Sequence, residues 1–202
     1  MVALGALLLA PVAAVVGFYQ AQQIEVGAAL ELEKNGHFRY QLDYGAVSEH
    51  AEGEWTFDGK AVRLTTKPKP TAPRFELVRD DPAPPGQIGL ALEPPGFGDG
   101  YRLRAIGTDA RSGEKGLVET DSEGRVEAGG RMLSAIEPLV PVYGVPAGSF
   151  ALSPDRGHRL LLRFHANDLA TAGFDNEPLA LTSRGLVLNR YDSAIRFLRV
   201  RP

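Results

Sequence analysis

The stretch that decides the fold is residues 28–66, which read AALELEKNGHFRYQLDYGAVSEHAEGEWTFDGKAVRLTT. Apolar or aromatic side chains recur in it at every second position, as in residues 38–44, FRYQLDY. Asn35-Gly36 and Asp58-Gly59 interrupt the alternation, and such pairs favour two-residue hairpin turns because they accept positive φ angles. Strict alternation with one apolar face predicts half-buried antiparallel strands. We therefore expect four short strands here, joined by tight turns.

The rest of the chain predicts further short strands. Apolar runs alternate with turn signals at intervals of roughly 8–12 residues, which is typical of an all-β sandwich or barrel. Only residues 167–172 suggest a helical turn, with Asn167 or Asp168 as its cap. Residues 186–200 resemble a closing hairpin around Asn189 to Ser193. We expect an all-β protein, an antiparallel meander (lipocalin-like or barrel-like) followed by a second β-sandwich-like module.

Two proline-rich breaks mark the expected domain boundary. Residues 67–73 contain three prolines, and residues 82–86 form the second break; proline removes a donor that a central strand needs. We predict a β-meander module over 18–80, a linker over 81–86 and a second β module over 87–202. A single sandwich built from both halves is the alternative.

Residues 2–17 form an apolar run of the length expected for the core of a signal peptide. Small residues at Ala14 and Gly17 suit a signal peptidase, although no Lys or Arg precedes the run. About 20 apolar residues are needed to span a bilayer, and this run is shorter. We expect residues 1–17 to be a cleaved signal peptide, with a new N-terminus between residues 15 and 22. An uncleaved anchor and a buried core helix are the alternatives.

Composition narrows the class of protein. The chain has 202 residues and no cysteine, which excludes disulfides, thiolate metal sites, a cysteine nucleophile and a lipid-modified N-terminal cysteine. The net charge of −3 is too small to indicate a polyanionic partner. Export without disulfides is compatible with a periplasmic or secreted bacterial protein.

Two segments resemble a module of the bacterial envelope: residues 30–40, LELEKNGHFRY, and residues 52–64, EGEWTFDGKAVRL. The order of strand, Gly turn, aromatic strand, Gly-x-Trp and second Gly turn is similar to lipocalin-like domains of small exported proteins. These include the N-terminal domain of the NlpE copper-homeostasis lipoprotein family. The resemblance implies a fold and a compartment. That family's lipidated cysteine and Cys-x-x-Cys pair are absent here, so no copper-binding residue carries over.

An aromatic face is the first candidate for a binding site. It comprises Tyr40, Tyr44, Trp55 and Phe57. Such rings can line a pocket for an apolar ligand at the mouth of a barrel. They can equally fill the interior, which in a small barrel is just wide enough for its own side chains.

Four histidines raise the question of a metal site: His37, His50, His158 and His165. His158 and His165 are seven residues apart, so on one strand they face opposite sides. His50 lies in the acidic segment 49–54, which we expect to be a connection. No motif with a known metal-ligand spacing is present, and we assign no metal or cofactor residues.

No Gly-x-Ser-x-Gly elbow marks a nucleophile, and we assign no catalytic residues. Ser149 and Ser153 lie in a Pro/Gly-rich loop in which nothing indicates an activating base. Asp80-Asp81 borders prolines, and because Asp favours turns we expect a solvated turn. The glycines of residues 96–100 precede a strand, whereas those of a phosphate-binding loop open a helix. We expect a flexible loop there.

Two further charged features have plain structural interpretations. Residues 121–124, Asp-Ser-Glu-Gly, have too few oxygen ligands for a calcium loop and predict a hairpin turn. The C-terminus carries five arginines against the single acid Asp192: Arg184, Arg190, Arg196, Arg199 and Arg201. A basic stripe can bind an anionic partner, but we expect most of these side chains to be solvated or to lie over apolar surface.

We therefore expect an exported, non-catalytic β protein that binds a small ligand or a cell-envelope partner. We do not expect it to bind a nucleic acid. Once the signal is removed, we expect no stable transmembrane span. One alternative is an exported hydrolase with a site built from loops such as 93–100 and 144–157. The other is a periplasmic metal-handling protein.

Overall fold

The computed structural model describes residues 12–24, 26–93 and 102–200. The chain forms two compact units: a barrel unit of residues 1–70 and 170–202, and an inserted unit of residues 71–169. Apart from the short 3-10 turn η1 (Val12–Ala14), every regular element among the described residues is a strand. The all-β prediction is confirmed. Residues 167–172 form a turn and a bridge instead of the helical turn that we expected.

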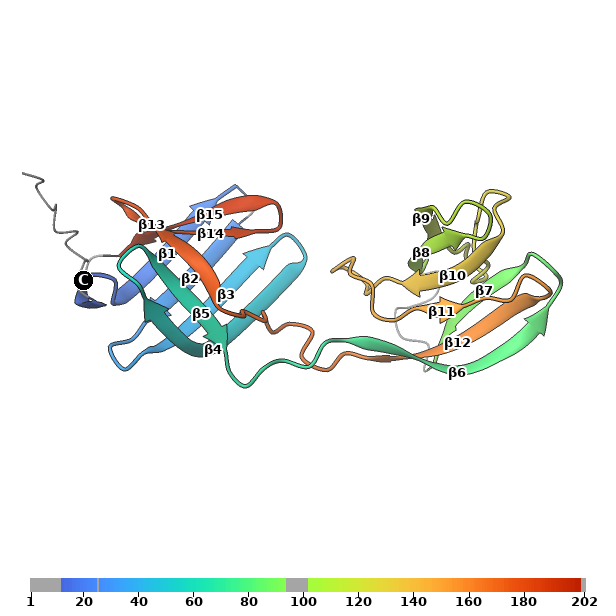
Figure 1. Cartoon of the computed structure of the whole chain (residues 1–202), viewed down its shortest axis with the longest axis horizontal. Coiled ribbons are helices and arrows are strands. Elements are labelled where there is room, and N and C mark those ends of the chain that lie inside the picture. The colour runs from blue at the N-terminus through green and yellow to red at the C-terminus, as the bar shows by residue number, and fades with distance from the viewer. Residues whose placement is uncertain (1–11, 25, 94–101, 201–202) are drawn as a thin grey trace, which may run out of the picture. The chain divides into compact units, whose positions relative to one another are not determined.

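The barrel unit is an eight-stranded, closed, antiparallel barrel (Figure 1). In spatial order its strands are β1 (Gly17–Gln23), β15 (Ser193–Arg199), β14 (Gly185–Arg190), β13 (Glu177–Leu181), β5 (Ala61–Thr66), β4 (Val47–Phe57), β3 (His37–Tyr44) and β2 (Val26–Leu32). Strands of the barrel pair with their neighbours in the chain at all but two places: β5 pairs with β13 across the insertion, and β1 pairs with β15 to close the barrel. Closure leaves no free sheet edge in this unit.

The two hairpin turns read from the sequence are present. The His37 amide donates to Asn35 Oδ1 (2.8 Å), and Gly36 has φ 86°. At the second turn the amides of Lys60 and Ala61 donate to Asp58 Oδ1 (2.9 and 2.8 Å). These turns fix the register, so alternate side chains of β3 and β4 point into the barrel.

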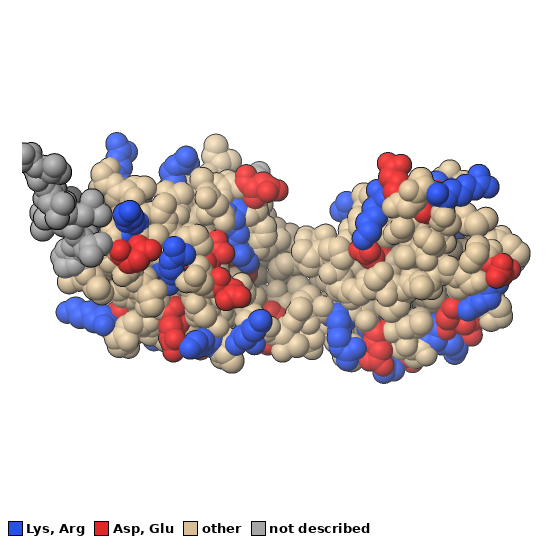
Figure 2. Space-filling model, viewed as in Figure 1, with Lys and Arg blue, Asp and Glu red and all other residues tan. Residues whose placement is uncertain are grey.

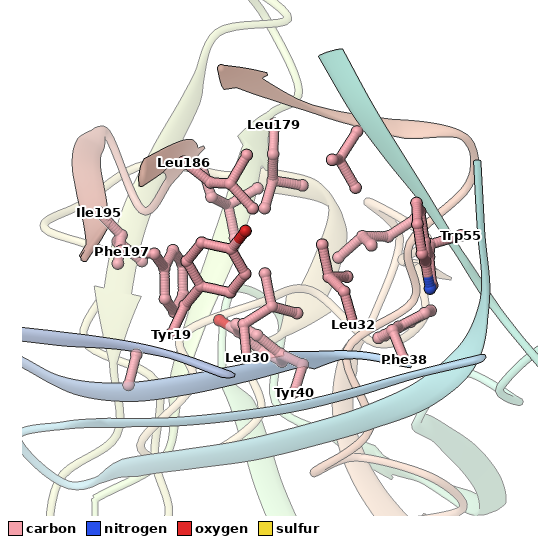
Figure 3. Close-up of a cluster of buried hydrophobic side chains, with 14 of the residues drawn as sticks. Tyr19, Leu30, Leu32, Phe38, Tyr40, Trp55, Leu179, Leu186, Ile195 and Phe197 are labelled. Atoms are coloured by element: carbon pink, nitrogen blue, oxygen red, sulfur yellow. The ribbon is translucent and has the colours of Figure 1, made fainter. Parts of the chain in front are cut away.

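The barrel interior is filled by one hydrophobic cluster (Figure 3). Its members come from all eight strands and include Tyr19, Leu30, Phe38, Ala51, Leu64, Leu179, Leu186 and Phe197. Trp55 is only 5% exposed, and its Nε1 donates to the Glu33 carbonyl (3.0 Å). The predicted dry face of the meander therefore faces the interior of a barrel.

The domain boundaries differ from those that we expected. The chain leaves the barrel after Pro70, within the first proline-rich break, but residues 170–202 return to complete it. β13 to β15 belong to the barrel and not to a module over 87–202, because β5 would otherwise be an unpaired edge. The expected linker at 81–86 also begins inside a strand, β6 (Arg74–Ala83).

The predicted signal peptide of residues 1–17 overlaps the first residues of the barrel unit. Residues 1–11 lie outside the described residues. Val15, however, is fully buried, and Gly17 is the first residue of β1, paired with Leu32. The expected cleavage range thus overlaps a strand of the barrel.

The inserted unit contains two sheets (Figure 1). A four-stranded sheet has the order β11 (Phe150–Ala151), β10 (Leu133–Pro138), β8 (Arg104–Asp109) and β9 (Lys115–Glu119). A three-stranded sheet has the order β6, β12 (Gly157–His165) and β7 (Ile88–Leu92), with β7 parallel to β12. Side chains from both sheets share one buried cluster, as in a sandwich.

The surface carries charges of both signs. Figure 2 shows Lys and Arg interspersed with Asp and Glu on the face in view. This agrees with the small net charge of −3. Within the described residues, no helix has the length and apolar character needed to cross a membrane.

Candidate functional site

The predicted aromatic face divides between the core and the surface. Tyr40 and Trp55 are buried in the barrel cluster, and Phe57 packs against that cluster. Tyr44 is 40% exposed and lies 6.4 Å, between ring centroids, from the ring of Tyr191. Three of the four rings therefore contribute to packing inside the barrel.

A buried ion pair lies among these rings. Glu49 of β4 is only 4% exposed, and its two oxygens accept Arg190 Nε (2.6 Å) and Nη2 (2.7 Å). The hydroxyls of Tyr40 (2.9 Å) and Tyr191 (2.7 Å) also donate to this carboxylate. The Arg190 guanidinium lies over the ring of Phe174, 5.3 Å from its centroid. Four donors thus satisfy the Glu49 carboxylate.

The tyrosines of this cluster are held in their protonated form. Burial, together with the hydrogen bond to Glu49, raises the pKa of Tyr191 to about 12. Burial and the nearby Glu49 carboxylate also raise the pKa of Tyr40. Tyr191 and Asp192 occupy left-handed φ angles of 53° and 54° in the β14–β15 turn, a conformation that glycine or asparagine usually takes. This geometry supports a structural role for the cluster, which closes one end of the barrel interior.

This cluster corrects one expectation, because the segment around Glu49 is part of β4 and not a connection. Arg190 is one of the arginines that lie over apolar surface, the ring of Phe174, and it also binds Glu49. Arg199 is exposed as expected, and it donates to the carbonyls of Ala14 (3.0 Å) and Val16. Arg184 and Arg196 are exposed as expected, and Arg201 lies outside the described residues.

A second polar cluster lies in the inserted unit. His158 of β12 is 3% exposed, and its Nδ1 donates to Asp80 Oδ2 (2.9 Å). Arg156 binds the same carboxylate through both terminal nitrogens. Both backbone groups of Ser153 lie at the other ring nitrogen: the Ser153 amide is 3.0 Å from His158 Nε2 and the Ser153 carbonyl oxygen is 3.2 Å from it. The prediction of a solvated turn at Asp80-Asp81 is therefore wrong, since both residues belong to β6 and pair with β12.

This cluster contains the residue types of a catalytic triad but a different geometry. A nucleophilic serine must present its hydroxyl to the histidine nitrogen that takes up its proton. Here the Ser153 amide occupies His158 Nε2, and the Ser153 hydroxyl contacts Asp155 instead (3.5 Å to Oδ2). Ser149 is not part of the cluster. The arrangement supports anchoring of the loop before β12 to the three-stranded sheet.

We expect this anchor to make the inserted unit sensitive to acid. Burial favours a higher pKa for Asp80, but hydrogen bonds from Arg156 and His158 outweigh it and lower the pKa below its usual value. A carboxyl with a lowered folded-state pKa stabilises the fold above its unfolded pKa of about 4, and this contribution disappears as the pH falls through the folded value.

The measurement is urea unfolding followed by far-UV circular dichroism, for the native protein and for Asp80→Asn. The variant should be less stable near neutral pH, and the difference should shrink as the pH is lowered below about 4. Asp81→Asn is the matched control, because the Asp81 carboxylate pairs with Arg79 at the surface. A constant difference across this range would contradict the role of Asp80.

The remaining histidines do not assemble a metal site. His37 lies near Glu33 and His165 binds Glu76, while the backbone of His50 bridges to Thr171. Within the described residues, no group of three His, Asp or Glu side chains could hold an ion. Asp121 forms the predicted turn by accepting the amides of Glu123 and Arg125. Residues 96–100 lie outside the described residues.

A strained apolar loop lies in the connection between β10 and β11, and the sequence had indicated only its last residues, as the start of the loop 144–157. In this loop, residues 139–146, Val142 has φ 68° and is 63% exposed, and Val145 is 45% exposed. The Tyr143 amide donates to the Pro141 carbonyl (2.8 Å), which with the positive φ makes a strained γ-turn.

The base of the loop is held firmly. The Val140 amide donates to the Val145 carbonyl and the Gly144 amide to the Val140 carbonyl, both at 2.8 Å. Leu139 and Pro146 form an isolated bridge, and Val140 is 1% exposed. The loop therefore presents Val142 and Val145 to solvent on a fixed backbone.

Comparison of the chain with protein-family models, with curated proteins and with solved structures finds no match.

Proposed function

We propose that the protein is exported to the bacterial cell envelope and acts there as a non-catalytic binding protein, whose 139–146 loop contacts a protein partner. The observation that carries the proposal is the strained, exposed Val142. A left-handed conformation costs a non-glycine residue roughly 1–2 kcal/mol, and such strain is concentrated at functional positions. A partner that presents an apolar groove fits the exposed Val142 and Val145.

Three other features support this proposal over the alternatives. Side chains of the barrel itself occupy the interior, where a small ligand would bind. Ser153 directs its amide, not its hydroxyl, to His158, which disfavours a hydrolase with that serine as nucleophile. The uncharged apolar run at 2–17 favours export, and a chain without cysteine is compatible with it.

Cross-linking in the bacterium that makes the protein tests the proposal. A photoreactive residue at Val145 should give a discrete adduct in the envelope fraction. The same residue at Leu117, a comparably exposed apolar position on β9 (51%), should give none. Equal adducts at both positions, or no adduct at Val145, would rule out the loop as the contact.

Val142→Gly should stabilise the isolated protein and weaken the contact. Glycine accepts φ 68° without strain, so we expect the free energy of unfolding to rise by about 1 kcal/mol. The adduct from position 145 should fall because the apolar tip is lost. Denaturant unfolding and the cross-linking yield measure the two effects separately. Lower stability would show that Val142 is not strained, and an unchanged adduct would show that it makes no contact.

A further inference from the structure

The boundary between exposed and buried chain at the N-terminus lies at one peptide bond. Residues 12–14, which form η1, are all exposed, with Val12 at 54%. The next residue, Val15, is fully buried and belongs to the barrel core. A processing protease that must leave an intact barrel can therefore cut no later than the Ala14–Val15 bond.

Residues after this bond each have a role in the barrel. The Tyr19 hydroxyl donates to the Val15 carbonyl (2.6 Å), and Tyr19 is only 2% exposed. Arg199 of β15 donates to the Val16 carbonyl. A cut after Gly17 would remove the acceptor of a buried hydroxyl, which is costly to leave without a partner.

The last residue before the bond matches the preference of a signal peptidase. That preference is for small side chains at the last and third-last positions of the leader, with the position between them free. Ala14 meets this preference at the last position, while the third-last position is held by the larger Val12, with Ala13 between them. Among the described residues, a cut here removes two hydrogen bonds, from Arg199 to the Ala14 carbonyl (3.0 Å) and from the Val15 amide to the Val12 carbonyl (3.2 Å).

We infer that a signal peptidase hydrolyses the Ala14–Val15 bond, so that Val15 is the first residue of the mature protein. Water adds across the C–N bond, which leaves a carboxylate on Ala14 of the leader and an amine on Val15. This inference rests on the export proposed above. The inference narrows the expected N-terminus of the mature protein from the range 15–22 to residue 15. The cut precedes closure of the barrel, because the Ala14 carbonyl is bound by Arg199 once the barrel has formed.

The test is N-terminal sequencing and intact mass of the protein recovered from the periplasmic fraction after expression of the full chain. We expect the sequence to begin at Val15. Ala14→Lys should leave the leader attached, because a long charged side chain occupies the last leader position. Ala13→Lys, an exposed neighbour in the same turn, should still be cut at Val15.

The outcomes separate this inference from the proposed function. Exported protein that begins at Phe18 or another later residue, or that keeps the leader, would overturn the cleavage position and leave export intact. Processing of Ala14→Lys at an unchanged rate would also overturn it. Protein of full mass that is confined to the cytosol would overturn export, and the cleavage with it.

Discussion

Arg190→Met should destabilise the barrel unit by about 3–5 kcal/mol, because it leaves the Glu49 carboxylate buried without its counter-charge. Glu49 is 4% exposed and takes both its charge-assisted bonds from Arg190. Methionine retains much of the apolar volume beside Phe174, so the loss reports the missing charge. Urea unfolding followed by tryptophan fluorescence is suitable, since the only tryptophan, Trp55, lies in this unit.

A double variant separates the ion pair from simple packing. Adding Glu49→Gln to Arg190→Met removes the buried charge but keeps an oxygen that can accept from Tyr40 and Tyr191. We expect the double variant to recover about 2 kcal/mol relative to Arg190→Met alone. Arg196→Met, an exposed position on β15, should change stability by less than about 0.5 kcal/mol. Equal stability of Arg190→Met and Arg196→Met would contradict the buried pair.

The strands and turns could be predicted from the sequence because their signals are local. Alternation in residues 38–44 and the Asn35 and Asp58 turns depend on residues only a few positions apart. The closure of the barrel does not, since Leu64 pairs with Glu177 across the whole inserted unit. Alternation assigns a residue to a face, but it does not say which distant strand lies beside it. The return of residues 170–202 was missed for this reason.

The two polar clusters also join residues that are far apart in the sequence, although in each cluster one residue could have been identified from the local pattern. Glu49 shares the parity of Trp55 on β4, and His158 shares that of Leu160 and Leu162 on β12. A charged or polar residue on the dry face of a strand needs a partner, so alternation alone could have identified both positions. Their partners, Arg190 and Asp80, are 141 and 78 residues away in the chain and carry no local signal. The strain at Val142 is likewise a property of the backbone, because nothing in the sequence around a valine predicts a positive φ angle there.

Trp55→Ala should cost about 3–5 kcal/mol, the usual range for removing a buried aromatic ring. Trp55 is 5% exposed, lies on the inward face of β4 and donates to the Glu33 carbonyl (3.0 Å). Because the change removes the fluorescent probe, thermal and urea unfolding should be followed by circular dichroism. Trp55→Phe keeps most of the ring volume and should lose only about 1 kcal/mol with the hydrogen bond.

Tyr44→Ala is the matched control for the ring, because Tyr44 belongs to the same aromatic set but is 40% exposed. We expect it to change the free energy of unfolding by less than about 1 kcal/mol. A large loss for Trp55→Ala with a small one for Tyr44→Ala is what a filled barrel requires, since only the inward ring leaves a void. If the two substitutions cost the same, Trp55 would not be part of the barrel core, and the interior would have room for a ligand.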